Sequence, residues 1–208
     1  MNTYSHALIG DLIYKYLKNN CDIHLDFEEF IMGNIIPDIR NTCVIRPHFI
    51  RFSLKYIQRE IELFSHKLLR SREIPKAHSL KLGVICHYYT DFFCYSHNGG
   101  YKQRIKNHKK YEADLNNYFT SRVDTIGLID LIPDRDIKNS AGEINERTAR
   151  LHREYITAPP SYENDIYYSL LACAGAVASL VRCCASNTVP AERFSVFMAR
   201  AALAAEGK

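Results

Sequence analysis

The stretch from Leu80 to His97, LKLGVICHYYTDFFCYSH, decides the fold of this chain. Apolar and aromatic residues lie on every side of it, as in a helix that is buried all round. It nevertheless carries His87 and Asp91, which are four residues apart and therefore share one face of a helix. An unpaired carboxylate in such surroundings costs several kcal/mol, so something must neutralise Asp91. A simple ion pair with His87 is one answer, and the rest of the chain offers another.

The remaining chain also has the apolar periodicity of helices. Of its 208 residues 47% are hydrophobic and 24% charged, and its 9 glycines and 7 prolines are too few for a sandwich or barrel. A chain of this size buries enough surface to fold without a metal or disulfide. We therefore expect a single all-α domain over residues 1–208, a multi-helix bundle. Helices are predicted near 3–19, 26–32, 51–71, 77–97, 101–119, 139–156, 163–184 and 191–205.

Two segments separate predicted helices, and a third is an apolar stretch whose length must be compared with that of a membrane span. The stretch from Ile31 to Arg46 is expected to be a long ordered loop. The turn Asn98-Gly99-Gly100 is expected to end the helix before it, because glycine accepts the left-handed conformation that ends helices. Residues 166–181 are apolar but shorter than the roughly 20 residues that a bilayer core requires, so they predict a buried central helix.

Charge and cysteine content limit the classes of partner and compartment. The 27 basic and 23 acidic residues leave a net charge of +4, which is too small to demand nucleic acid as a partner. Seven cysteines without framework spacing, and no export signal, predict reduced thiols and a cytoplasmic protein. A basic run is interpreted as a solvated helix face, and local binding of a phosphorylated or anionic partner is the alternative; it comprises Lys102, Arg104, Lys106, Lys109 and Lys110.

A second histidine and carboxylate pair follows on the next predicted helix. His108 and Glu112 repeat the spacing of four, and the turn at 98–100 folds this helix back so that the two pairs can face each other. Facing helices that each supply nitrogen and oxygen ligands are how bundle cores hold metal ions. His97 closes the first helix at the same end. The pattern predicts a metal cluster in a cleft between helices.

Two upstream segments and one early histidine add candidate ligands. Asp38 directly follows Pro37 in an apolar stretch, and His48 follows Pro47 in the same way. Turn chemistry is the alternative explanation for either one alone. His6 lies on the apolar face of the first predicted helix, where a satisfied core histidine is the alternative to a ligand.

Taken together, these residues resemble the zinc-dependent phospholipase C family, whose distant relatives include the single-strand-specific zinc nucleases. The order of the ligands and the intervals of four and six within 87, 91 and 97 match the family pattern. The resemblance covers roughly residues 1–120, and the remainder carries no recognised motif. It rests on His6, on GNIIPD at 33–38, on Pro47 with His48, on the block from Gly83 to Asn98, and on His108 with Glu112.

The resemblance implies how these ligands divide among zinc ions. One ion would be held by Asp38, His48, His87 and Asp91, and a second by His97, His108 and Glu112 with an open position. In the family a third zinc uses the residue matching His6, a bridging carboxylate matching Asp91, and the amine and carbonyl of an N-terminal tryptophan. This sequence contains no tryptophan. A third ion is therefore expected to be absent, bound more weakly, or ligated by the unprocessed terminus.

Zinc accepts imidazole and carboxylate ligands, and clustered zinc ions hold phosphate oxygens and activate water. The resemblance therefore implies hydrolysis of a phosphodiester or phosphomonoester, with Asp38 orienting or deprotonating the attacking water. The expected substrate is a small phosphoester or a phospholipid headgroup, with transient contact with a membrane surface and no specific nucleic acid.

Two other functions compete with this interpretation. A nuclease or nucleotidase would resemble His-x3-Asp at the last ligand, whereas this chain has Glu112, which favours the lipid branch. The residue after Asp38 is Ile39 and not the aromatic residue of the choline pocket, so choline specificity is not expected. The third alternative is a non-catalytic, metal-stabilised helical domain that binds a partner.

Overall fold

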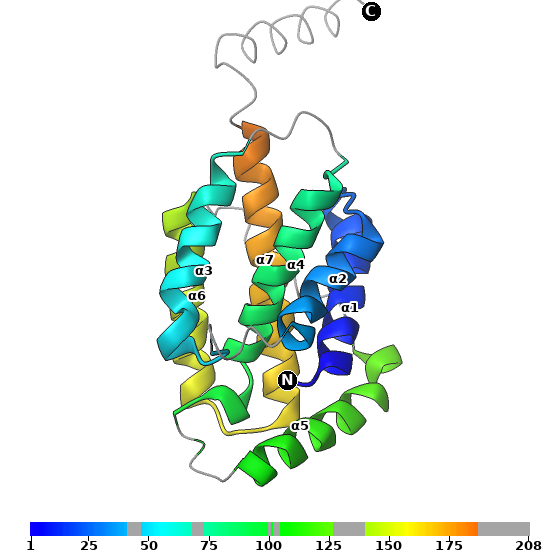
Figure 1. Ribbon diagram of the computed structural model, residues 1–208, viewed down its shortest axis with the longest axis vertical. Coiled ribbons are helices and arrows are strands. Elements are labelled where there is room, and N and C mark those ends of the chain that lie inside the picture. The colour runs from blue at the N-terminus through cyan, green and yellow to red at the C-terminus, as the bar shows by residue number, and fades with distance from the viewer. Residues whose placement is uncertain (41–46, 68–72, 100, 102–104, 127–139, 187–208) are drawn as a thin grey trace, which may run out of the picture.

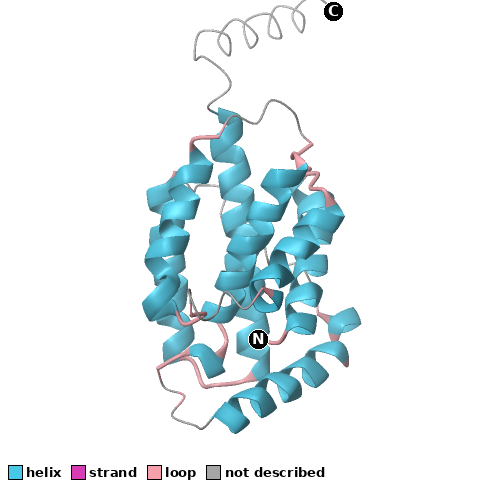
Figure 2. Cartoon of the chain, in the orientation of Figure 1, coloured by secondary structure: helices cyan, strands magenta, loops and turns pink. Residues whose placement is uncertain are grey.

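A computed structural model of the chain describes residues 1–40, 47–67, 73–99, 101, 105–126 and 140–186. Within these ranges the chain forms helices and no β-strand, which confirms the all-α prediction (Figure 2). The helix expected at 191–205 lies outside the described residues. The α-helices are α1 (Thr3–Cys21), α2 (Phe27–Ile39), α3 (Ile50–Ser65), α4 (Lys76–Phe92), α5 (Ile105–Thr120), α6 (Ala141–Thr157) and α7 (Tyr162–Ser186), and 3-10 turns lie at Tyr95–His97 and Val123–Thr125.

The helices α3, α4, α6 and α7 run alongside one another with α1 and α2 beside α4, and α5 crosses one end of this bundle beside the N-terminus (Figure 1). The helix α4 lies at the centre and packs against α1, α2, α3 and α7. By length and composition α7 could cross a bilayer, but 72% of its apolar window is buried inside the protein. It is therefore the buried central helix that the sequence predicts, and it packs against α4 in the core.

Two glycines let α2 and α4 touch backbone to backbone. A Cβ built on Gly33 would lie 2.1 Å from the Leu80 carbonyl oxygen, and one built on Gly83 would lie 2.3 Å from the Phe30 carbonyl oxygen. No side chain fits between helices this close. The contact fixes the distance between the end of α2, which carries Asp38, and the centre of α4.

The prediction of a loop from Ile31 to Arg46 is wrong over residues 31–39, because α2 continues to Ile39. Pro37 lies inside this helix, where it removes one backbone donor and leaves the Gly33 carbonyl without its usual helical partner. The loss falls in the last turns of the helix, and the close packing of α2 on α4 outweighs it. The part at 41–46 lies outside the described residues.

The predicted end of α4 is also wrong, because the helix stops at Phe92 and not at the glycine pair Gly99-Gly100. Asn98 donates through Nδ2 to the carbonyl oxygens of Phe92, at 3.0 Å, and Cys94, at 2.8 Å. The buried Asp165 carboxylate of α7 accepts from the Tyr95 amide at 3.0 Å. These side chains satisfy backbone groups that the interrupted helix leaves free, so the break is stable inside the core.

Candidate metal centre

The break in α4 decides where His97 lies. Residues six apart on an unbroken helix point to different sides of it, because each residue adds about 100°. In the structure the 3-10 turn carries His97 back, and its Nε2 lies 3.5 Å from Oδ1 of Asp91. Nε2 of His97 also lies 2.9 Å from Oε1 of Glu112, so His97 links Asp91 of α4 to the ligands of α5.

All eight candidate ligands meet at the end of the bundle that α5 crosses. Four of them, His6, His87, Asp91 and His97, are 6% exposed or less. The eight ligands come from six segments: His6 from α1, Asp38 from α2, His48 from just before α3, His87 and Asp91 from α4, His97 from the 3-10 turn, and His108 and Glu112 from α5.

The first donor group joins the end of α2 to the centre of α4. Oδ1 of Asp38 lies 3.6 Å from Nδ1 of His48 and 3.8 Å from Nε2 of His87. Nδ1 of His48 lies 2.9 Å from Oδ2 of Asp91, and Nε2 of His87 lies 3.5 Å from that same oxygen. Donors held tetrahedrally at roughly 2.0–2.1 Å from zinc lie roughly 3.3 Å apart. The donor atoms of Asp38, His48 and His87 lie close enough together to share a zinc ion, and Asp91 forms a second such group with His6 and His87.

Two residues that the sequence analysis did not select orient these donors. Nδ1 of His87 lies 2.8 Å from the backbone oxygen of Asn34, so it carries the proton and leaves the lone pair of Nε2 for a metal. The hydroxyl of Thr3 donates to Oδ2 of Asp38 at 3.0 Å. Asn34 lies within the GNIIPD motif, whereas nothing in the sequence distinguishes Thr3. Both contacts depend on the packing of α2 against its neighbours.

The second donor group lies between the 3-10 turn and α5. Nε2 of His97 and Nε2 of His108 lie 2.9 Å and 3.1 Å from Oε1 of Glu112. Unlike the first group it is partly open, since the His108 side chain is 24% exposed. The group borders a cleft of about 700 Å³ that is also lined by Asp38, His48, Phe49 and Lys109. Three protein ligands beside an open cleft are the arrangement of a catalytic zinc site.

Around Asp91 a third set of groups surrounds the amino group of Met1. Oδ1 of Asp91 lies 3.3 Å from Nε2 of His6 and also accepts a hydrogen bond from the Met1 amino group. The amino nitrogen lies 3.2 Å from Nε2 of His97 and 3.3 Å from Oε1 of Glu112. The terminus therefore places a positive charge where imidazole and carboxylate donors converge.

Burial and neighbouring charges set the protonation of the centre. Burial lowers the pKa of His87 well below its ordinary value. Burial alone would raise the pKa of Asp91, but His97 and the Met1 ammonium outweigh it and hold that pKa well below the usual range. Neutral imidazole and ionised carboxylate are the forms that bind zinc. His48 differs, because its contact with Asp91 raises its pKa despite burial, so protons compete with a metal there.

Some buried atoms of the centre that could coordinate a metal lack hydrogen-bond partners among the residues that the structure describes. They include Nε2 of His6 and Oδ2 of Asp91. The latter lies 2.9 Å from Nδ1 of His48, yet the two atoms do not form an aligned hydrogen bond. Buried polar atoms are normally satisfied, so these donors point to a shared cation. The eight side chains are imidazoles and carboxylates with no thiolate, a set that suits zinc.

The other histidines take no part in these groups. His24 and His66 lie outside the centre; Nε2 of His24 pairs with Asp22 at 3.0 Å, and His66 is exposed at the end of α3. The ring of His78 packs on Phe64. Nε2 of His152 lies 2.9 Å from Oδ1 of Asn98, in the network behind the break of α4. None of the four belongs to a metal-competent group in the described part of the chain.

Comparison with known proteins agrees with this geometry. No curated protein and no solved structure matches the chain. A family model described as zinc dependent phospholipase C matches residues 5–162, a range that contains all eight candidate ligands. The match covers well over half of the chain and confirms the resemblance seen in the ligand spacing. The chain therefore belongs to the zinc-dependent phospholipase C family.

Proposed function

We propose that this protein is a zinc-dependent phosphoesterase that hydrolyses phosphodiester bonds in the manner of a phospholipase C. The observation that carries the proposal is the cluster of eight imidazole and carboxylate side chains at one cleft of about 700 Å³. Five of them line the cleft, and His6, His87 and Asp91 lie buried behind it. Zinc ions bound there would supply phosphate coordination, activation of water and neutralisation of the leaving oxygen. Membership in the family supports the same reaction class.

The donor groups suggest two or three zinc ions with different accessibility. The more buried group comprises Asp38, His48 and His87, with Asp91 close to both histidines, and the more open one comprises His97, His108 and Glu112. A third ion would use His6, His87 and Asp91. The Met1 ammonium lies beside Asp91 and His97, so a third ion would have to displace it or take its deprotonated amine as a ligand.

Asp38 is the residue that we assign to the attacking water. Its side chain is 20% exposed and lines the cleft, so a water molecule in the cleft can reach it. One carboxylate oxygen faces His48 and His87, and the other accepts from Thr3. The Thr3 hydroxyl fixes the direction of the carboxylate, which is what a base that must orient water requires.

The cleft is suited to a small phosphoester. Its volume falls within the range of ordinary small-molecule sites. Lys109 lines one wall and supplies a positive charge outside the donor groups, where it can pair with a phosphate oxygen. Ile39, the residue after Asp38, is 61% exposed and offers no aromatic ring, so no preference for choline is proposed.

The test compares Asp38→Asn with the wild-type protein on bis-p-nitrophenyl phosphate, p-nitrophenylphosphocholine and single-stranded DNA, with zinc measured on the same samples. Asparagine keeps the size and one ligating oxygen but loses the basic charge. Turnover of the small diester should therefore fall by roughly 10²–10⁴-fold, with a much smaller change in zinc content. Asp11→Asn is the matched control, because Asp11 pairs with Lys15 on the surface of α1.

Each alternative function has its own outcome in this panel. Robust cleavage of DNA by the wild-type protein would move the assignment to the nuclease branch. Zinc binding without turnover of any phosphoester would favour a non-catalytic binding domain. Unchanged turnover in Asp38→Asn would show that the reaction needs no base at this position.

A further inference from the structure

The mouth of the metal cleft carries an exposed aromatic surface. Phe52, in the first turn of α3, is 57% exposed, and its ring centroid lies 6.4 Å from that of Phe49. Phe49 lines the cleft, and its ring centroid lies 5.5 Å from that of His97. Aromatic surface is thus continuous from solvent to a candidate zinc ligand. Together with Arg51, which lies between them in the sequence, we name Phe49 and Phe52 the α3 rim.

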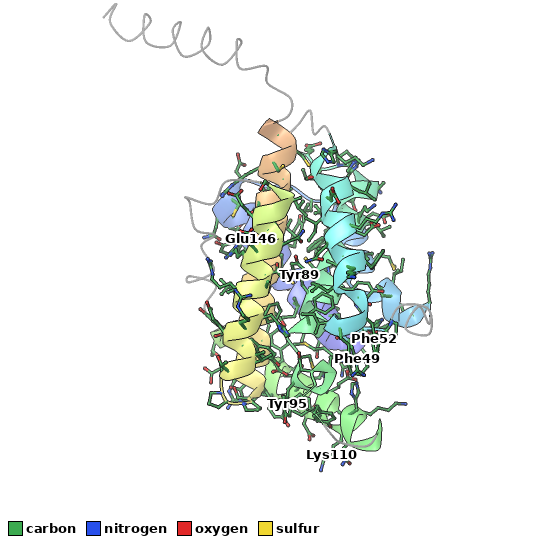
Figure 3. All side chains as sticks on the ribbon, turned by 90° about the vertical axis from the view of Figure 1, so that its left-hand side faces the viewer. Phe49, Phe52, Tyr89, Tyr95, Lys110 and Glu146 are labelled. Atoms are coloured by element: carbon green, nitrogen blue, oxygen red, sulfur yellow. The ribbon has the colours of Figure 1, made fainter. Side chains whose placement is uncertain are left out.

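Positive charge surrounds the α3 rim. The guanidinium carbon of Arg51 lies 4.5 Å from the ring centroid of Phe52 and 5.7 Å from that of Phe49. Lys55 and Arg59 continue the exposed, basic surface along α3, and residues 47–59 contain no acidic residue. Across the cleft, Lys109 of α5 is also exposed. Figure 3 places Phe49 and Phe52 at the end of α3 nearest to α5.

A single exposed apolar side chain needs no explanation, and Leu63 farther along α3 is such a case at 46% exposure. The α3 rim differs because two contiguous rings lie under a guanidinium at the entrance to a reaction site. Aromatic residues that enter the headgroup region, beside Arg and Lys that attract anionic lipids, are the features of helices that lie in a membrane interface.

We infer that the α3 rim docks this protein on an anionic phospholipid surface. The inference rests on the proposed function, since docking at this position presents the cleft to the layer of lipid headgroups. Phe52 would transfer its exposed ring area from water into the interface, and Arg51 and Lys55 would contact lipid phosphates. Because the rings contact His97 through Phe49, the docked surface is continuous with the zinc ligands.

The test measures co-sedimentation of the full chain with vesicles of phosphatidylcholine alone and of phosphatidylcholine mixed with phosphatidylserine. The wild-type protein should bind the mixed vesicles more tightly, and added salt should weaken this binding. Phe52→Ser should lower the affinity about tenfold, because the ring area no longer enters the interface. Leu63→Ser, on the same helix and similarly exposed, should bind as the wild type does. Circular dichroism checks that each variant is folded.

Two outcomes would overturn the inference: a folded Phe52→Ser protein that binds mixed vesicles as tightly as the wild type, or a wild-type protein that binds neither vesicle. The second would leave the α3 rim as a surface for a protein partner. Wild-type hydrolysis of soluble bis-p-nitrophenyl phosphate, measured without vesicles, tests the proposed function separately. Hydrolysis without vesicle binding rejects docking alone, and vesicle binding without hydrolysis rejects the proposed function alone.

Discussion

Replacing Gly83 by alanine sets helix propensity against packing. In the middle of an isolated helix, alanine is more stable than glycine by about 1 kcal/mol. In this structure the new Cβ would lie 2.3 Å from the carbonyl oxygen of Phe30 and 2.9 Å from Cα of Gly33. Both neighbours are backbone atoms of α2, so no side-chain rotation relieves the contact.

The size of the effect follows from the shift that the helices must make. An ordinary contact begins at 3.4 Å, so α2 and α4 must separate by about 1 Å. Overpacking costs about 1–3 kcal/mol, and a contact this short with backbone atoms lies at the upper end of that range. After subtraction of the roughly 1 kcal/mol gained in helix propensity, a net loss of about 1–2 kcal/mol lowers Tm by roughly 2–8 °C. The same shift moves Asp38 and Asn34 on α2 away from His87 on α4. A displacement of about 1 Å in a reaction site can reduce turnover 10²-fold.

The assay is thermal unfolding with zinc content and diester hydrolysis measured on the same preparation. Gly142→Ala is the matched control, because its Cβ meets only the hydroxyl of Ser140 at 3.9 Å. Propensity alone acts there, and Tm should stay the same or rise. An unchanged or higher Tm for Gly83→Ala, with normal zinc content, would refute the argument that the two glycines set the spacing of the site.

Three further predictions concern the metal and its ligands. Elemental analysis of the purified protein should find two or three zinc ions per chain, and chelation should abolish activity well before it unfolds the core; less than about one ion would contradict the ligand assignment. His87→Ala should reduce zinc content and activity by at least tenfold, roughly, whereas His66→Ala should leave both intact. Equal losses in the two variants would mean that the ligands are assigned incorrectly. Burial lowers the pKa of His87 and His97, and these two outweigh His48, whose pKa is raised, so the unfolded chain binds more protons. The zinc-free protein should therefore lose stability as pH falls below about 6.5; denaturant melts at several pH values would show this, and a stability that rises on acidification would contradict it.

Much of the metal centre could be predicted because its spacing is local. On a helix, residues four apart share a face, so His87 with Asp91 and His108 with Glu112 could be paired from the sequence alone. The hydrophobic periodicity likewise predicted α1, α6 and α7 within a few residues of their observed bounds. The end of α3 was less well predicted, since the helix stops at Ser65 and not at 71.

The rest depended on contacts between segments far apart in the chain. Apolar periodicity cannot show that α2 runs through Pro37, because the energy that holds it there comes from packing against α4. Nor can it show that α4 stops at Phe92, because Asn98 and the distant Asp165 satisfy the backbone at the break.

The sequence by itself determined the helical class of this protein, which residues are candidate zinc ligands, and which of these pair within one helix. These features follow from local periodicity and side-chain chemistry. Tertiary structure alone decided that His97 returns to Asp91, that Asn34 and Thr3 orient the ligands, and that the aromatic α3 rim borders the cleft. Each of these is a distance between segments, and such distances are set by how the helices pack.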